Sequence, residues 1–302
     1  MGREEIVQKF ESLRPWQKSG KRAPHKPLLV LYAIRRLLQD SKRCLRYSEV
    51  HENLGKLLEE FGPTEAKPRP YYPFWHLKND GVWEIPDAKK IRETVSGDPF
   101  KRDLDHHDVS GGFPKDIVHQ LQKDSTLSLE IIQSLLEIHF PHSIHEDILQ
   151  AVEIDSPLQI SKPQRRDPKR RKRDPSFRAN ILKAYEYKCA VCGFDVKLGT
   201  SPIALEAAHI KWYTHRGPDT EANGLALCSL HHKLFDLGAF TLSNQLAILV
   251  SEDARGSVGF QEWLMKFHGE QISFPQRPSY YPEVEFIGWH VKEVFKGDYR
   301  EL

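Results

Sequence analysis

The chain has 302 residues, of which 39% are hydrophobic and 28% charged. This composition can bury a core, which excludes a wholly disordered chain, and the length predicts two domains. No apolar run approaches the roughly 20 residues that span a bilayer, and the charged start of the chain is unlike a signal peptide, so we expect an intracellular, cytoplasmic protein with no membrane partner.

The N-terminal part is predicted to be mainly helical, with one β-hairpin. Apolar residues recur with helical spacing over 25–40, which we expect to be the central helix, and again over 114–153. Within 71–85, two aromatic-rich runs flank Asn79-Asp80-Gly81, which is typical of a hairpin with a glycine-dependent turn. Helices followed by a hairpin are compatible with a winged-helix-like arrangement.

The net charge of +2 hides an uneven distribution. Residues 161–178 hold nine Lys and Arg against two Asp, and large apolar residues are almost absent from this stretch. A segment of this kind cannot bury enough surface to order itself and is typical of nucleic-acid contact. We therefore predict an N-terminal domain over 1–155, a basic linker over 156–175 and a C-terminal domain over 176–302.

Three of the four cysteines lie close together in the C-terminal domain. Cys189 and Cys192 form a C-x-x-C pair, and Cys228 and His231 form a C-x-x-H pair further along. Two such pairs supply the four corners of a tetrahedral zinc site. A thioredoxin-like dithiol is the alternative, but no βαβ pattern surrounds the pair. The spacing predicts a structural Zn²⁺ ion.

Three further polar residues lie between and beside these pairs. His209 ends the apolar run Leu205 to Ile210, which predicts a strand; Asn223 follows, and His232 comes directly after the proposed zinc ligand His231. The zinc ion would hold the strand and the next helix together and aim His209 and His232 into one pocket. Zinc with four protein ligands has no open position, so any chemistry must come from these neighbours and a second metal.

The arrangement of these residues resembles the HNH endonucleases, whose fold is the ββα-metal fold. The match covers about residues 177–252 and includes a first strand that reads Glu-Ala-Ala-His-Ile. The resemblance implies that His209 is the general base, that Asn223 orients the loop and base or coordinates metal, and that His232 binds a catalytic Mg²⁺, Mn²⁺ or similar ion. Many HNH enzymes have a metal ligand directly before the base, where this chain has Ala208. Glu206 or Asp236 would substitute for that ligand.

A second resemblance concerns about residues 10–100. His25-Lys26-Pro27-Leu28-Leu29, Tyr72-Pro73-Phe74-Trp75 and Asp80-Gly81-Val82-Trp83 together resemble the sulfur-binding domain of phosphorothioate-dependent type IV restriction endonucleases. The resemblance implies that Tyr72 and Pro73 cup the sulfur, with His25 and Lys26 as polar contacts. His76 stands where that family has a small residue.

The sequence thus predicts an α+β protein, a modification-dependent restriction endonuclease that recognises phosphorothioated double-stranded DNA and hydrolyses its backbone. One alternative is an HNH nuclease that reads methylated or otherwise modified bases, in which Tyr71, Tyr72 and Trp75 stack on a flipped base. A zinc-stabilised DNA-binding regulator that does not cut is another. Cleavage of both strands by one centre per chain would suggest a homodimer.

Overall fold

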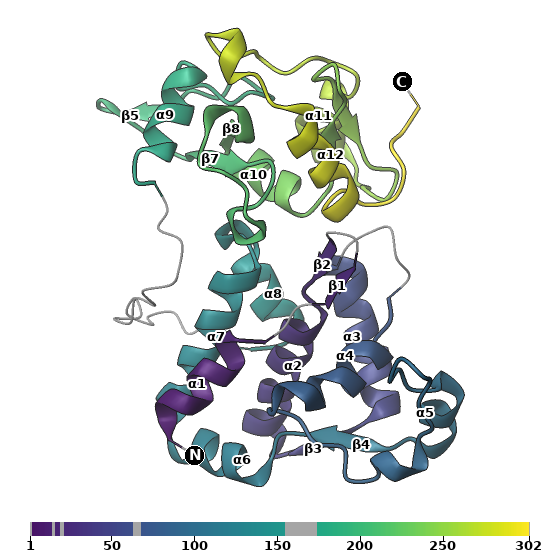
Figure 1. The fold of residues 1–302 in the computed structure, drawn as a ribbon. Helices are drawn as coiled ribbons and strands as arrows, with labels where there is room; N and C mark the ends of the chain where they lie inside the picture. Colours follow the sequence, from purple (N-terminus) through teal and green to yellow (C-terminus); the bar gives the residue numbers. More distant parts are fainter. Residues whose placement is uncertain (1, 14–15, 19–20, 63–67, 155–173, 302) are drawn as a thin grey trace. The chain divides into compact units, whose positions relative to one another are not determined.

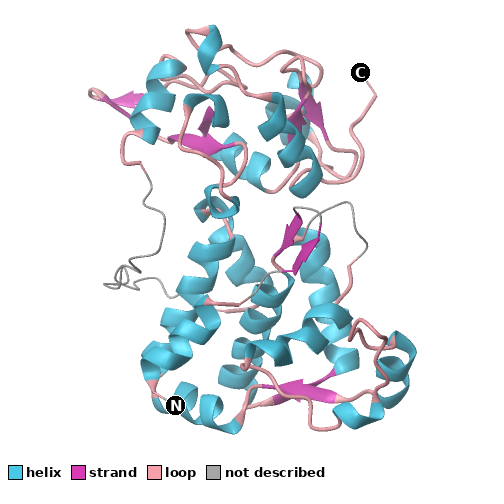
Figure 2. Cartoon of the chain, viewed as in Figure 1, coloured by secondary structure: helices cyan, strands magenta, loops and turns pink. Residues whose placement is uncertain are grey.

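The computed structural model describes residues 2–13, 16–18, 21–62, 68–154 and 174–301. The chain divides into two compact units, one before and one after residues 155–173, and each is an assembly of helices with small two-stranded sheets (Figure 1, Figure 2). This confirms the α+β fold class. No helix in the described ranges is long and apolar enough to cross a membrane. The predicted linker, 156–175, lies almost wholly outside the described residues, so the domain boundaries stay predictions.

Helices dominate the N-terminal unit. In chain order its elements are α1 (Arg3–Glu11), β1 (Trp16–Lys18), β2 (Lys21–Ala23), α2 (His25–Asp40), β3 (Cys44–Arg46), α3 (Tyr47–Phe61), α4 (Tyr71–His76), η1 (Leu77–Asp80), η2 (Ala88–Lys90), α5 (Lys101–His107), β4 (Ser110–Gly112), α6 (Lys115–Lys123), α7 (Ser125–His139), η3 (His142–Ile144) and α8 (His145–Ala151). β1 pairs with β2 and β3 with β4, both antiparallel.

Helix α2 is the central helix, as the apolar pattern predicts. Every residue from Pro27 to Ile34 is buried, and α2 packs against α3, α4 and α7. A helix that is apolar on all faces must be covered on all faces, so α2 is the scaffold on which the other helices are placed.

The predicted β-hairpin over residues 71–85 is wrong. Residues 71–80 form α4 and η1 instead, and the winged-helix-like arrangement loses the hairpin on which it depended. Pro73 lies in the first turn of α4, where its missing N–H is tolerated, and Gly81, with φ of +70°, caps the end of η1. A glycine after Asn-Asp serves a helix end as well as a hairpin turn.

The C-terminal unit is built around a β-hairpin and the helix that follows it. Its elements are α9 (Phe177–Ala184), β5 (Lys197–Leu198), β6 (Ser201–Pro202), β7 (Leu205–His209), η4 (Tyr213–His215), η5 (Glu221–Asn223), β8 (Gly224–Cys228), α10 (Ser229–Asp236), β9 (Phe240–Leu242), β10 (Ile248–Val250), α11 (Val258–Trp263), η6 (Met265–Phe267), η7 (Pro278–Tyr280) and α12 (Val284–Glu293). β7 and β8 are antiparallel, with His209 opposite Gly224, and α10 begins directly after β8.

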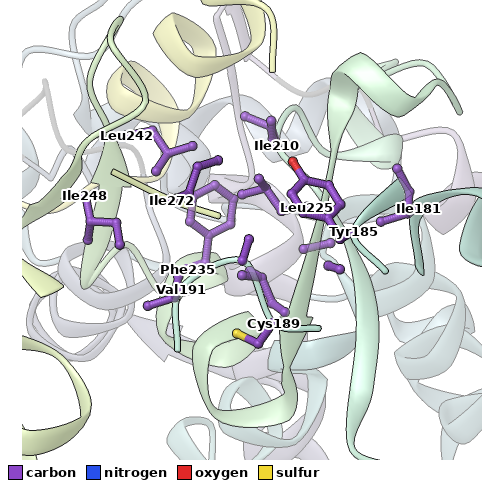
Figure 3. Packing of buried hydrophobic residues seen from close by; sticks show 14 of the residues in the cluster. Ile181, Tyr185, Cys189, Val191, Ile210, Leu225, Phe235, Leu242, Ile248 and Ile272 are labelled. Atoms are coloured by element: carbon purple, nitrogen blue, oxygen red, sulfur yellow. The ribbon is translucent and has the colours of Figure 1, made fainter. Parts of the chain in front are cut away.

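One apolar core joins these elements. All five residues of β8 are buried, and residues from α9, β8, α10, β9 and β10 pack together (Figure 3). Cys189 lies in this core with no exposed surface. The core therefore fixes the ends of β7 and α10, where the predicted site residues lie.

Candidate active site and metal cluster

The four predicted zinc ligands lie together. The ligand atoms of Cys189, Cys192, Cys228 and His231 are all within 4.8 Å of one another. Nδ1 of His231 is 3.1 Å from Sγ of Cys228, while its Nε2 lies 2.8 Å from the carbonyl oxygen of Trp263. Because a carbonyl can only accept, Nε2 carries the proton and Nδ1 offers its lone pair to a metal. Three sulfurs and one imidazole nitrogen fit a tetrahedral zinc ion.

His209, at the end of β7, is held by a carboxylate and a ring. Its Nε2 is 2.8 Å from Oδ1 of Asp219, and its ring stacks on Phe177 of α9 with centroids 4.0 Å apart. Asp219 also accepts a hydrogen bond from the backbone N–H of Asp174. A carboxylate only accepts, so the neutral imidazole keeps its proton on Nε2, and Nδ1 is the nitrogen that can take up a proton.

Asn223 is fully buried and holds the loop that follows β7. Its Oδ1 accepts a hydrogen bond from the backbone N–H of Lys211, and its Nδ2 donates to the carbonyl oxygens of Lys211 and Pro218. The loop between these two residues carries Trp212, and Asp219 comes directly after it. A single amide therefore fixes the path of the segment that supplies the carboxylate partner of His209.

His232, on α10, lies between two carboxylates. Its Nδ1 is 2.6 Å from Oε2 of Glu206, and its Nε2 is 3.1 Å from Oδ2 of Asp236. Burial by itself lowers the pKa of His232, but the charges and hydrogen bonds of Asp236 and Glu206 outweigh it and raise that pKa to about 10. The hydrogen bond from His232 in turn lowers the pKa of Glu206 to about 2.

Among the described residues, the Cys189, Cys192, Cys228 and His231 cluster is the one group of three or more ligands placed to hold a metal, and the residues around His232 are predicted ligands of a second ion. Carboxylate oxygens are the donors that Mg²⁺ and Mn²⁺ prefer, and two carboxylates, those of Glu206 and Asp236, contact the ring of His232. Ala208 contributes no donor, and the structure brings Glu206 and Asp236, the two predicted substitutes, to the same histidine. Asp236 is 3% exposed, and its Oδ1 accepts a hydrogen bond from Nε1 of Trp212.

Asp219 and Trp212 were missed by sequence reasoning. Each is the partner of a predicted residue, Asp219 of His209 and Trp212 of Asp236. Both come from the loop between β7 and η5, which has no periodic pattern. The signal for Asp219 in the sequence is an acidic residue shortly before Asn223, and that signal says nothing of Trp212.

In the N-terminal unit, the start of α2 meets the end of η1. Nζ of Lys26 forms an ion pair with Asp80, and the two side chains are 13% and 6% exposed. The positive charge of Lys26 is thus neutralised by Asp80 inside the protein. His25 is half-buried; burial, with a smaller contribution from the charge of Arg69, lowers its pKa to about 4. Near neutral pH His25 is uncharged.

Tyr72 and His76 lie one turn apart on α4 and share a carboxylate. Their rings are 4.8 Å apart, Nε2 of His76 is 3.0 Å from Oδ1 of Asp98, and Tyr72 also hydrogen-bonds to Asp98. Pro73, which lies between them in the sequence, is buried. Trp75 is 1% exposed, and its Nε1 donates a hydrogen bond to Glu93. The face of Trp75 is not free to stack on a flipped base.

Comparison with known proteins assigns both units. The family described as ScoMcrA-like, DNA sulfur-binding domain, matches residues 3–157, and the family described as HNH endonuclease matches residues 189–243. The fold and site therefore define a DNA-binding protein with a nuclease domain of the HNH type. The chain belongs to the ScoMcrA-like DNA sulfur-binding domain family, as the sequence resemblance predicts.

Solved structures resemble the chain weakly. The sulfur binding domain of ScoMcrA complexed with phosphorothioated DNA is 22% identical, covers 49% of this chain and 95% of that chain, and has a TM-score of 0.42. The Type IV phosphorothioation-dependent restriction endonuclease ScoMcrA is 14% identical over 76% of this chain and 94% of that chain, with a TM-score of 0.37. The modification dependent TagI restriction endonuclease is 25% identical, covers 39% of this chain and 37% of that chain, and has a TM-score of 0.30. No curated protein matches the chain.

Proposed function

We propose that the chain is a modification-dependent restriction endonuclease that binds phosphorothioated DNA through its N-terminal unit and hydrolyses the DNA backbone through its C-terminal unit. The observation that carries this proposal is the pair of histidine–carboxylate groups on β7 and α10, in a chain whose other half belongs to a DNA sulfur-binding family. A general base and a cation site are the two requirements of phosphodiester hydrolysis.

His209 acts as the general base in this proposal. Its Nδ1 takes a proton from water while the water oxygen forms a bond to phosphorus and the bond from phosphorus to the leaving oxygen breaks. Asp219 keeps the Nε2 proton in place and stabilises the imidazolium that forms. Asn223 holds the loop and contributes no direct chemistry.

His232 and Asp236 would hold the divalent ion, Mg²⁺ or Mn²⁺, while Glu206 contacts the other ring nitrogen of His232. When bound, the ion neutralises the negative charge that grows on the phosphate oxygens. Zn²⁺ in the cluster of Cys189, Cys192, Cys228 and His231 has a structural role only.

Recognition of the modified backbone falls to the first turn of α4 and the start of α2. A non-bridging sulfur is softer than oxygen and a poorer hydrogen-bond acceptor, so an apolar surface costs it less desolvation. Tyr72, which is partly exposed, supplies that surface, with His76 as an adjoining wall; Pro73, which the resemblance assigns to the same surface, is itself buried. A neutral His25 donates a hydrogen bond to the neighbouring phosphate or base. Lys26 reaches DNA only by exchanging Asp80 for phosphate.

Matched duplexes that differ in one backbone sulfur test this proposal. We expect the full chain to bind and cut the phosphorothioated duplex, and to bind its unmodified and base-methylated counterparts far more weakly. Equal affinity for the methylated duplex would favour the base-reading alternative. A second sample, His209→Ala, should bind as the wild type does without cutting; cleavage by it would reject His209 as the base.

The same chemistry suggests an oligomeric state. One HNH centre per chain cuts one strand at a time, so a double-strand break made in one encounter needs two chains. We therefore keep the homodimer as a prediction, which mass photometry on the DNA-bound protein checks.

A further inference from the structure

Helix α12 lies beyond the segment that matches the HNH family, yet it contacts two segments next to Asp236 of the proposed cation site. The match ends at residue 243, and α12 begins at Val284. Four of its residues, Phe286, Ile287, His290 and Glu293, are buried. Its partners include the end of α10 and the loop after β7, the two segments that supply and support Asp236.

The first contact fixes the C-terminal turn of α10. His290 has no exposed surface, its ring stacks on Phe235 with centroids 3.7 Å apart, and its Nε2 donates to the carbonyl oxygen of Phe235 at 3.0 Å. Nδ1 of His290 accepts from the hydroxyl of Thr241. Carbonyls at the end of a helix need partners from outside the helix. His290 thus holds the residue directly before Asp236.

The turn after α10 is closed by the chain that follows α12. Gly238 has a φ of +78°, and a Cβ placed on it would lie 2.1 Å from the carbonyl oxygen of Val294. Its own carbonyl accepts from the backbone N–H of Lys296. Only glycine allows this approach, which ties the end of α12 to the end of α10.

The second contact fixes the donor to Asp236. The ring of Trp289 lies 5.7 Å from that of Trp212 and 5.3 Å from that of His215, centroid to centroid. Trp212, 7% exposed, donates its Nε1 proton to Oδ1 of Asp236 at 2.9 Å, while Oδ2 of Asp236 faces His232. Trp289 therefore packs against Trp212, the side chain that orients the carboxylate of Asp236.

We infer that α12 is a positioning element of the nuclease site: Trp289, through Trp212, sets the carboxylate of Asp236 for the catalytic divalent ion. This inference rests on the proposed function. Residues that orient a metal ligand without touching the metal commonly change metal affinity 10–100-fold when replaced. Trp289 acts one residue further away, so the expected effect is about 5- to 10-fold.

Mn²⁺ binding to the full zinc-loaded chain, followed by the electron paramagnetic resonance signal of free Mn²⁺, tests the inference without relying on activity. Trp289→Ala should raise the Kd for Mn²⁺ about 5- to 10-fold, and Trp289→Phe should stay within about 2-fold of the wild type. Val291→Ala, at an exposed position of the same helix, is the matched control and should bind as the wild type does.

Trp212→Phe keeps an aromatic ring and removes only the N–H donor, so it gives an answer even if Trp289→Ala does not fold. It should weaken Mn²⁺ binding with an unchanged zinc content, and cleavage should need correspondingly more Mn²⁺. A folded Trp289→Ala or Trp212→Phe protein with the wild-type Kd overturns the inference. If His232→Ala and Asp236→Ala also bind Mn²⁺ as tightly as the wild type, the metal assignment of the proposed function fails instead.

Discussion

Asp219 decides which nitrogen of His209 can act as the base. Its carboxylate lies 2.8 Å from Nε2, and a carboxylate has no proton to give near neutral pH. Asn in its place could present an N–H to Nε2 and stabilise the other tautomer, with the proton on Nδ1. The geometry of the site would survive while the base was blocked.

We therefore expect Asp219→Asn to lower the rate of cleavage about 100-fold or more, with unchanged affinity for phosphorothioated DNA. Single-turnover cleavage and fluorescence anisotropy measure the two quantities. Asp195→Asn, at an exposed aspartate of the same unit, is the control. A normal rate in Asp219→Asn would mean that the hydrogen bond to Nε2 does not select the tautomer.

The half-buried position of His25 links folding of the N-terminal unit to pH. Burial, with the charge of Arg69, lowers its pKa from 6.5 to about 4, so the unfolded chain binds a proton at a pH where the folded chain does not. Stability contributed by the neutral imidazole is complete above about pH 6.5 and is lost as the pH falls toward 4.

Between pH 6.5 and pH 5 this should cost the N-terminal unit up to about 2 kcal/mol of unfolding free energy. Urea titrations at the two pH values, following the transition of that unit, measure the loss. His25→Gln has no group to titrate there and should show a smaller difference. An equally steep fall in His25→Gln would place the effect on another group.

The residue scale also shows what sequence can and cannot supply. Cys189, Cys192, Cys228 and His231 were found because two short, regular spacings bring each pair together locally. His76 was noticed only as a departure from a family pattern. Its contact with Asp98 joins residues from separate segments, and no regular spacing in the sequence predicts such a pair.

At the scale of elements, the sequence predicts helices well where one face is apolar. The ranges 25–40 and 114–153 contain helices with buried faces, and the strand ending at His209 is present. The segment 71–85 was misjudged because aromatic residues favour strands in isolation. Phe74 and Trp75 are instead buried on adjacent positions of a short helix packed against α2. Tertiary packing outweighs local preference there.

The zinc cluster joins the loop after α9 to the start of α10, so we expect the C-terminal unit to depend on it. Metal binding of this kind contributes on the order of 10 kcal/mol to folding. Cys228→Ala should lose zinc, unfold this unit and abolish cleavage, while the N-terminal unit still binds phosphorothioated DNA. Elemental analysis and circular dichroism measure the change.

Cys44→Ala is the matched control for the zinc prediction. Cys44 lies on β3 of the other unit and is not part of the cluster, so its replacement should leave the zinc content unchanged. A Cys228→Ala protein that remains folded and cuts DNA would show that the hydrophobic core alone holds β8 and α10 together.

At the scale of the whole molecule, the two units divide recognition from chemistry, and we predict a third contribution to DNA binding from the basic run Lys169 to Arg173. These residues lie outside the described ranges, so the prediction about them comes from charge alone. Lys and Arg contacts to phosphate carry no information about the modification and release counterions, which makes the affinity depend on salt. Sulfur recognition by an apolar surface does not share this dependence.

Replacing all five residues of the run by Gln should therefore weaken binding to phosphorothioated and unmodified duplexes by the same factor. The slope of log affinity against log salt should become shallower, by up to about 0.9 for each phosphate that the variant no longer neutralises. Exchanging only its three arginines for lysine keeps the charge and should keep the slope. A loss of affinity confined to the phosphorothioated duplex would mean that the run takes part in reading the modification, because an electrostatic contact cannot distinguish the two backbones.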